Sequence, residues 1–272
     1  KLHYVSNGNE ENPLMLFLHG FPEFWFSWKE QLKEFSKDHF VVALDMRGYG
    51  ESEKLDGVNN YRAELITEDI KEFIESFNRK KIILVAHDWG GVIAWRVAMS
   101  YPEKLEKLII LNAPHPLAFR DVLKIKWKQF FMSWYMYFFN LPILPELIIL
   151  SNDLSTFNQV YKSKEGKNLF SLEELEAYKY IYSKPNALTC PLNYYRANLR
   201  SVGYSKQTQS TLIKTPTLII WALNDTALSE ELAPASAKYC ENVTIRNIAN
   251  CSHWVQHEQP QLVNQYIRDF LR

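Results

Sequence analysis

Short apolar runs alternate with helical patterns through the first 116 residues, and this alternation restricts the possible folds more than any other feature. Residues 13–20, 40–45, 81–87 and 105–112 are rich in Val, Ile and Leu and have the length of buried strands. Helical periodicity runs through residues 27–36, 63–77 and 92–102 between them. The alternation predicts the α/β class, with a mostly parallel, doubly wound sheet and helices on both faces.

The alternation stops near residue 117 and resumes near residue 212. Strands are predicted at residues 215–223 and 243–249, and helices at 229–239 and from about residue 260. The residues between are helical in pattern, aromatic and interrupted by prolines. We therefore predict a core built from residues 1–116 and 212–272, with a helical cap inserted as residues 117–211.

The most apolar part of the predicted cap is residues 130–150, in which Glu146 is the one charged residue. Its length matches a membrane span of roughly 20 residues. Pro142 and Pro145, however, predict that a helix ends near Asn140. This favours a cap helix that rests on a membrane surface over a segment that crosses the bilayer.

Charge and cysteine content narrow the possible partners. Lys and Arg together number 31, as do Asp and Glu, so no charge excess points to nucleic acid as a partner.

The sequence has three cysteines, Cys190, Cys240 and Cys251. They are too few and too scattered for a disulfide framework or a metal site, which favours a reducing compartment. The chain begins at Lys1 without Met, so we expect further sequence upstream in the full protein.

Candidate catalytic residues stand just beyond the carboxyl ends of three predicted strands, where ligands bind in such sheets. Asp88 follows residues 81–87, Asp225 follows 215–223, and His253 comes after 243–249. A nucleophile, an acid and a histidine in this order are typical of α/β-hydrolase triads. An Asp at a strand end also caps helices, but all three residues together favour catalysis.

The turn around Asp88 has the small residues that a tight strand-to-helix corner requires, namely Ala86, Gly90 and Gly91. Serine esterases place a serine at this corner within G-x-S-x-G, a motif that this sequence lacks. A carboxylate there can displace a leaving group at an sp³ carbon without a base to activate it. His253 would then activate water against the resulting ester, with Asp225 orienting the imidazole.

The segments "HGFPEFW", "DMRGYGES", "AHDWGG", "LND" and "SHW" occur in this order. Together they resemble the epoxide hydrolases of the α/β-hydrolase fold, over about residues 2–271, and most of all an animal branch with an N-terminal membrane anchor. The resemblance implies hydrolysis of lipophilic or fatty-acid epoxides to vicinal diols through an ester of Asp88, with water as co-substrate. It implies no cofactor and no metal. An intracellular location follows, either cytoplasmic or at the cytosolic face of the endoplasmic reticulum membrane.

The resemblance also implies roles for residues around the triad. The amides of Phe21 and Trp89 would form the oxyanion hole, and the Phe21–Pro22 bond would be cis. Tyr195, in "LNYYRANLR", and Tyr135, in "SWYMYFFNLP", would donate protons to the epoxide oxygen, with Tyr137 as the competitor for the second role. The predicted substrate-binding residues are Phe21, Trp89, Pro114, Phe138 and Trp254.

Two other functions remain open from the sequence. A haloalkane dehalogenase uses the same Asp nucleophile and binds halide with the Trp after it, which here is Trp89. Its second halide donor is usually Asn or Glu at the position of Phe21, and Phe has no such donor. A catalytically silent hydrolase fold that acts as a binding module is the other alternative.

Overall fold

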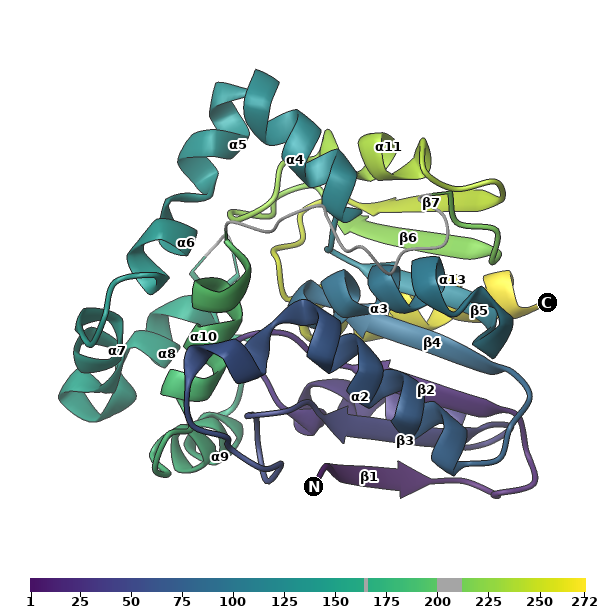
Figure 1. The fold of residues 1–272 in the computed structure, drawn as a ribbon, viewed down its shortest axis with the longest axis horizontal. Helices are drawn as coiled ribbons and strands as arrows, with labels where there is room; N and C mark the ends of the chain where they lie inside the picture. The colour runs from purple at the N-terminus through teal and green to yellow at the C-terminus, as the bar shows by residue number, and fades with distance from the viewer. Residues whose placement is uncertain (164–165, 200–211) are drawn as a thin grey trace.

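The structure, a computed structural model, describes residues 1–163, 166–199 and 212–272, and is built around one central sheet (Figure 1). In the described residues the sheet has seven strands in the order β1-β3-β2-β4-β5-β6-β7. The strands are β1 (His3–Asn7), β2 (Leu14–Leu18), β3 (Phe40–Asp45), β4 (Ile82–His87), β5 (Leu105–Leu111), β6 (Thr217–Ala222) and β7 (Val243–Ile248). Strand β1 pairs antiparallel with β3, and the other pairs are parallel.

Helices cover both faces of the sheet. Helices α2 (Ala63–Ser76) and α3 (Asp88–Ser100) contribute to the apolar cluster on one face, which also contains Leu16 of β2. Helices α1 (Lys29–Phe35) and α13 (Pro260–Leu271) contribute to the cluster on the other face, with Phe17. Since side chains alternate along a strand, a strand apolar at every position is buried from both sides. The predicted α/β class and doubly wound sheet are confirmed.

Strand β1 was not predicted from the sequence. It lies at the edge of the sheet, and its residues are exposed or half-buried, so they include polar side chains. An edge strand of this kind lacks the apolar run that identifies the inner strands.

The chain leaves the sheet after β5 and returns at β6. Between them run α4 (Pro116–Ile125), α5 (Trp127–Met132), α6 (Trp134–Phe139), α7 (Leu144–Leu154), α8 (Thr156–Val160), α9 (Leu172–Tyr182) and α10 (Thr189–Asn198). Figure 1 shows α5 to α10 gathered at one end of the sheet, while α4 lies beside α11 (Leu232–Ala237). Residues 200–211, the last part of the predicted cap, lie outside the described residues.

Residues 130–150 are divided among three short helices. Helix α6 ends at Phe139, as Pro142 and Pro145 predict, and α7 begins at Leu144. Across this break Trp127–Phe139 and Leu144–Leu154 meet at an angle of 89°. Among the described residues no single helix is long and apolar enough to cross a membrane, although this bent pair reaches the length and composition together.

Candidate active site

Asp88 stands where β4 passes into α3, and its backbone is in the left-handed region with φ of 48°. Such a conformation is uncommon for a residue with a side chain, and strained backbone of this kind is one feature of active sites. The corner is tight: a Cβ on Gly90 would collide with the carbonyl of Leu18, and one on Gly91 with the side chain of Ala113. The two glycines therefore let α3 start directly against the sheet.

The three predicted triad residues lie together. His253 Nδ1 is 2.6 Å from Asp225 Oδ2, a short hydrogen bond, and His253 Nε2 is 3.6 Å from Asp88 Oδ2. The loops after β6 and β7 thus bring Asp225 and His253 to the corner formed by Asp88. This is the geometry in which an acid orients a base, and the base faces the nucleophile.

Burial and charge act in opposite directions on this pair. Burial raises the pKa of Asp225, but the positive charge and hydrogen bond of His253 outweigh it and lower that pKa. Burial also lowers the pKa of His253, yet the Asp225 and Asp88 carboxylates raise it well above its usual value. Asp225 is therefore an anion at neutral pH, and His253 is held positive while Asp88 is charged.

The backbone of the loop after β2 reaches the nucleophile. The Phe21 amide donates to Asp88 Oδ1 at 2.8 Å, and the Phe21–Pro22 bond is cis, as predicted. Trp89, the next residue after Asp88, lies in the first turn of α3, where backbone N–H groups have no partner within the helix. The Phe21 amide is thus already placed to stabilise negative charge on an Asp88 oxygen.

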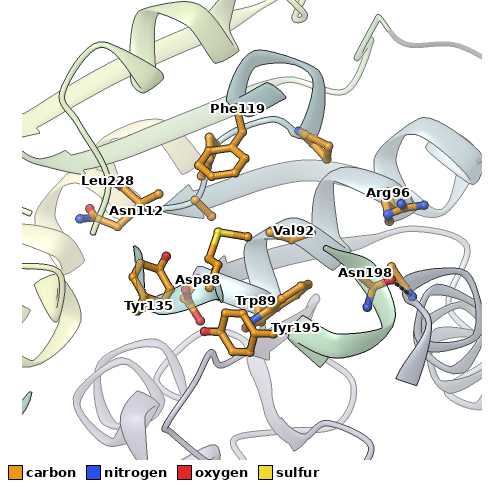
Figure 2. Close-up of a pocket in the computed structure, with 15 residues that line it drawn as sticks. Asp88, Trp89, Val92, Arg96, Asn112, Phe119, Tyr135, Tyr195, Asn198 and Leu228 are labelled. Carbon is orange, nitrogen blue, oxygen red and sulfur yellow. Dashed lines mark hydrogen bonds between the residues drawn. The ribbon is translucent and has the colours of Figure 1, made fainter. Parts of the chain in front are cut away.

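A cavity opens beside Asp88, and its lining comes from both the sheet core and the helices between β5 and β6. Figure 2 shows Tyr135 of α6 and Tyr195 of α10 next to Asp88 in its lining. The two rings lie 6.1 Å apart between centroids. Burial and the charge of Asp88 raise the pKa values of both hydroxyls, so both are protonated and able to donate.

The other predicted site residues are divided between the cavity and its surroundings. Trp89 and Pro114 line the cavity. The remaining three, Phe21, Phe138 and Trp254, are not among its lining residues. Phe21 packs edge-on against Tyr195, and Trp254 donates its indole N–H to the carbonyl of Val160.

Phe139 occupies the place that its neighbour Phe138 was expected to hold, whereas Tyr135 itself faces the cavity. Phe139, and not Phe138, packs against the rings of Phe21 and Tyr195. Tyr137, the competitor of Tyr135, is 49% exposed and is absent from the cavity lining. The helical turn of α6 therefore directs Tyr135 inward and Tyr137 outward.

Asn112 is a site residue that the sequence reasoning missed. Its side-chain Nδ2 donates to Asp225 Oδ2 at 2.6 Å, and its Oδ1 accepts from the Ala222 amide at 2.9 Å. Asn112 thus ties the end of β5 to the end of β6 and holds the acid that orients His253. Its position directly after a predicted strand was the signal that could have identified it.

A buried polar cluster around Glu23, behind the triad, was also not predicted from the sequence. Glu23 accepts from His87 Nδ1 at 2.8 Å and from Gln256 Nε2 at 2.8 Å, and lies 3.0 Å from His257 Nε2. His87 Nε2 in turn lies 2.9 Å from the carbonyl of His253. The side chains of His87 and His257 are buried or nearly so, and they connect the Phe21 loop to the His253 loop.

No group of three or more His, Cys, Asp or Glu side chains within the described ranges is arranged to hold a metal ion.

The chain matches the family described as the α/β hydrolase fold over residues 13–260. It is 43% identical to epoxide hydrolase 1 of Caenorhabditis elegans, over 100% of this chain and 68% of that relative. It is 40% identical to human epoxide hydrolase 4, over 100% of this chain and 76% of that relative. The Bacillus megaterium epoxide hydrolase, solved with an inhibitor, superposes with a TM-score of 0.91 at 33% identity, covering 99% of this chain and 96% of that one. The chain that places Asp88, Asp225 and His253 together in this way belongs to the epoxide hydrolases of the α/β hydrolase fold.

Proposed function

We propose that the enzyme opens epoxides to vicinal diols through a covalent ester on Asp88. The observation that carries this proposal is the position of the Asp88 carboxylate, 2.8 Å from the Phe21 amide and 3.6 Å from His253 Nε2, beside two tyrosine hydroxyls. An Asp88 oxygen attacks an epoxide carbon, the C–O bond of the ring breaks, and Tyr135 or Tyr195 donates a proton to the departing oxygen.

Water then cleaves the ester. It attacks the carbonyl carbon of the Asp88 ester while His253 Nε2 takes its proton, and the imidazolium returns this proton to the departing oxygen so that the diol leaves. The Asp88 carboxylic acid then loses its proton, through water, to the tyrosinate left by the first step, which restores both residues. The 3.6 Å separation is longer than a hydrogen bond but within reach through one water molecule. The amides of Phe21 and Trp89 stabilise the oxyanion, and losing one such donor typically costs about 10²–10³ in rate.

We propose that the substrates are lipophilic. Apart from Asp88, the tyrosines and a few amide or guanidinium groups, the cavity is lined by apolar side chains such as Val92, Phe119, Met136 and Leu228. Apolar lining with a small number of polar groups is typical of sites that bind hydrophobic ligands.

The tyrosine pair favours an epoxide over a haloalkane. An epoxide oxygen stays on the product and must be protonated, whereas a halide leaves as a weak base. Two protonated hydroxyls beside the nucleophile match the first requirement. The halide donor at the position of Phe21 is absent because Phe has no polar side-chain atom.

We also propose that the cap contacts a membrane surface. Most of the large apolar side chains that are exposed in the described residues fall between residues 125 and 150. They include Trp127, Phe131, Trp134, Ile143 and Leu147, which are each 62% to 75% exposed. Exposed Trp and Leu on helices that lie along a surface are typical of proteins that enter the membrane interface.

The covalent mechanism is tested with two variants. Asp88→Ala should form no diol, because no other nucleophile stands at the corner. His253→Gln should still be alkylated, because the carboxylate attacks without the base, but should not hydrolyse the ester. Intact-protein mass spectrometry of His253→Gln mixed with an epoxide should show one added substrate mass. Diol formation by Asp88→Ala at the wild-type rate contradicts the mechanism, as does an unmodified His253→Gln that binds substrate.

A further inference from the structure

The cavity follows one side of α3 from Asp88 to Arg96. Asp88, Val92 and Arg96 are spaced four residues apart, and all three line the cavity. At 1.5 Å per residue, the Cα atoms of Asp88 and Arg96 are about 12 Å apart along the helix axis. Figure 2 shows Arg96 at the side of the cavity away from Tyr135 and Asp88. The cavity thus has a carboxylate at one end and a guanidinium at the other.

The guanidinium of Arg96 is buried and only partly satisfied. The residue is 6% exposed. Its Nη1 donates to Glu64 Oε1 at 3.2 Å, and its Nε is buried without a hydrogen-bond partner among the described residues. Charge-assisted bonds are usually about 2.7–2.9 Å, so the bond to Glu64 is long. Residues 200–211, which the structure does not describe, contain no Asp or Glu.

The surroundings of Arg96 suit the charged end of an otherwise apolar ligand. Ala63 and Val92 line the cavity beside it, and apolar side chains continue towards Asp88. A carboxylate offers two oxygens in one plane and so matches the fork of an Arg guanidinium. The Glu64 side chain is 30% exposed, so water can solvate it when a ligand takes its place on Arg96.

We propose that Arg96 binds the carboxylate of an epoxy fatty acid and thereby holds the epoxide at Asp88. The inference rests on the proposed function and adds the residue that binds the acid end of the substrate and so sets its orientation. Repulsion from the Asp88 carboxylate keeps the acid end away from the nucleophile, while attraction to Arg96 places it at the far end of the cavity. Because the two groups are separated along α3, the preferred epoxide lies within the acyl chain and not beside the carboxylate.

The test compares an epoxy fatty acid with its methyl ester below their micelle-forming concentrations, together with a neutral alkyl epoxide. The wild type should have a higher kcat/KM for the acid than for the ester. In Arg96→Met the ratio of these two values should fall by about 10–100-fold, the range for a hydrogen bond to a charged group. Arg96→Lys, which keeps the charge but not the fork, should give an intermediate ratio. A general loss of activity lowers kcat/KM for the acid and for the ester by the same factor, so it leaves their ratio unchanged.

Glu64→Gln distinguishes two roles of Arg96: binding the ligand carboxylate, or only linking α3 to α2 through its ion pair with Glu64. If Arg96 binds the ligand, removing its competing carboxylate should raise the acid-to-ester ratio; if Arg96 only ties the helices, the ratio should not rise. Arg268→Met is the matched control, since Arg268 is paired with Glu34 and does not line the cavity. A non-epoxidised fatty acid of the same length should inhibit the wild type, and Arg96→Met should weaken this inhibition.

The possible failures are distinguishable. An acid-to-ester ratio that is unchanged in Arg96→Met, or that does not rise in Glu64→Gln, overturns the role of Arg96. Absence of turnover with every epoxide, the neutral one included, contradicts the proposed function instead. In that case binding of the non-epoxidised fatty acid to the wild type and to Arg96→Met, measured by calorimetry, still tests Arg96 alone: equal affinities refute its role.

Discussion

The charge of Asp88 is one of the factors that hold His253 protonated. Burial lowers the pKa of His253, whereas the carboxylates of Asp225 and Asp88 raise it. In the proposed mechanism, formation of the ester turns Asp88 into a neutral group, which removes its part of the increase in the pKa of His253. The pKa of His253 must then fall, so the imidazole loses its proton more readily in the intermediate that needs a base.

Asp88→Asn should reproduce this change because its amide is neutral like the ester. We expect a lower pKa of His253 in this variant than in the wild type, with Asp225 still keeping it above the value that burial alone would allow. NMR titration of the His253 imidazole in the wild type and in Asp88→Asn measures the two pKa values. Since the base must be neutral, ester hydrolysis should speed up as pH rises through the pKa of His253 in the intermediate. An equal His253 pKa in the two proteins would refute the coupling.

The tyrosine hydroxyls should act in the first half-reaction only. Tyr135→Phe and Tyr195→Phe should each slow alkylation by about 10–10³, near the range for general acid catalysis. Binding should weaken less, because the epoxide oxygen is a poorer acceptor before the ring opens. Pre-steady-state Trp fluorescence follows alkylation, and Tyr137→Phe, which alters an exposed residue, is the control. A double variant with an unchanged alkylation rate would move the assignment towards a haloalkane dehalogenase.

The ring of Phe139 connects helix α6 to the loop that carries Phe21. Phe139 packs against Tyr195 at 5.0 Å and Phe21 at 5.4 Å between ring centroids, whereas Phe138 packs against Trp134. Phe139→Ala should therefore loosen both Tyr195 and Phe21 and slow alkylation more than Phe138→Ala does. Stopped-flow measurement of the two variants side by side tests this. Equal effects would show that the ring of Phe139 does not position the acid.

The sequence predicts best those elements that can be identified from the residues of one short segment. Inner strands such as β4 are apolar at each position because both faces are buried, and Asp88 follows β4 at a corner that only small neighbours permit. Asn112 and Glu23 were missed because their roles depend on partners more than 60 residues away, Asp225 and His87. A single polar residue gives no sign of such a partner until the strands have been placed side by side.

Across the whole molecule, the two half-reactions of the proposed mechanism would draw on different parts of the chain. Asp88, Asp225 and His253 stand at the ends of sheet strands, while Tyr135 and Tyr195 come from helices between β5 and β6. The sheet thus positions the proposed nucleophile and base, and the cap supplies the proposed proton donors and much of the cavity wall. On this mechanism, a change in the cap should alter which epoxides are opened without altering how the ester is hydrolysed.

Part of the exposed apolar surface lies on α6, the helix that carries Tyr135. If this surface enters a membrane, as proposed, a lipophilic epoxide has a short path from the membrane to the cavity. Replacing Trp127, Phe131 and Trp134 by Ser should weaken binding to lipid vesicles, by about tenfold per side chain if each is buried in the bilayer. Leu172→Ser with Tyr180→Ser is the matched control, because both residues are exposed on α9, outside this surface. Vesicle co-sedimentation measures the partition, and turnover of a water-soluble epoxide checks that each variant is folded. Equal sedimentation of the triple variant and the control would show that the surface does not enter the membrane.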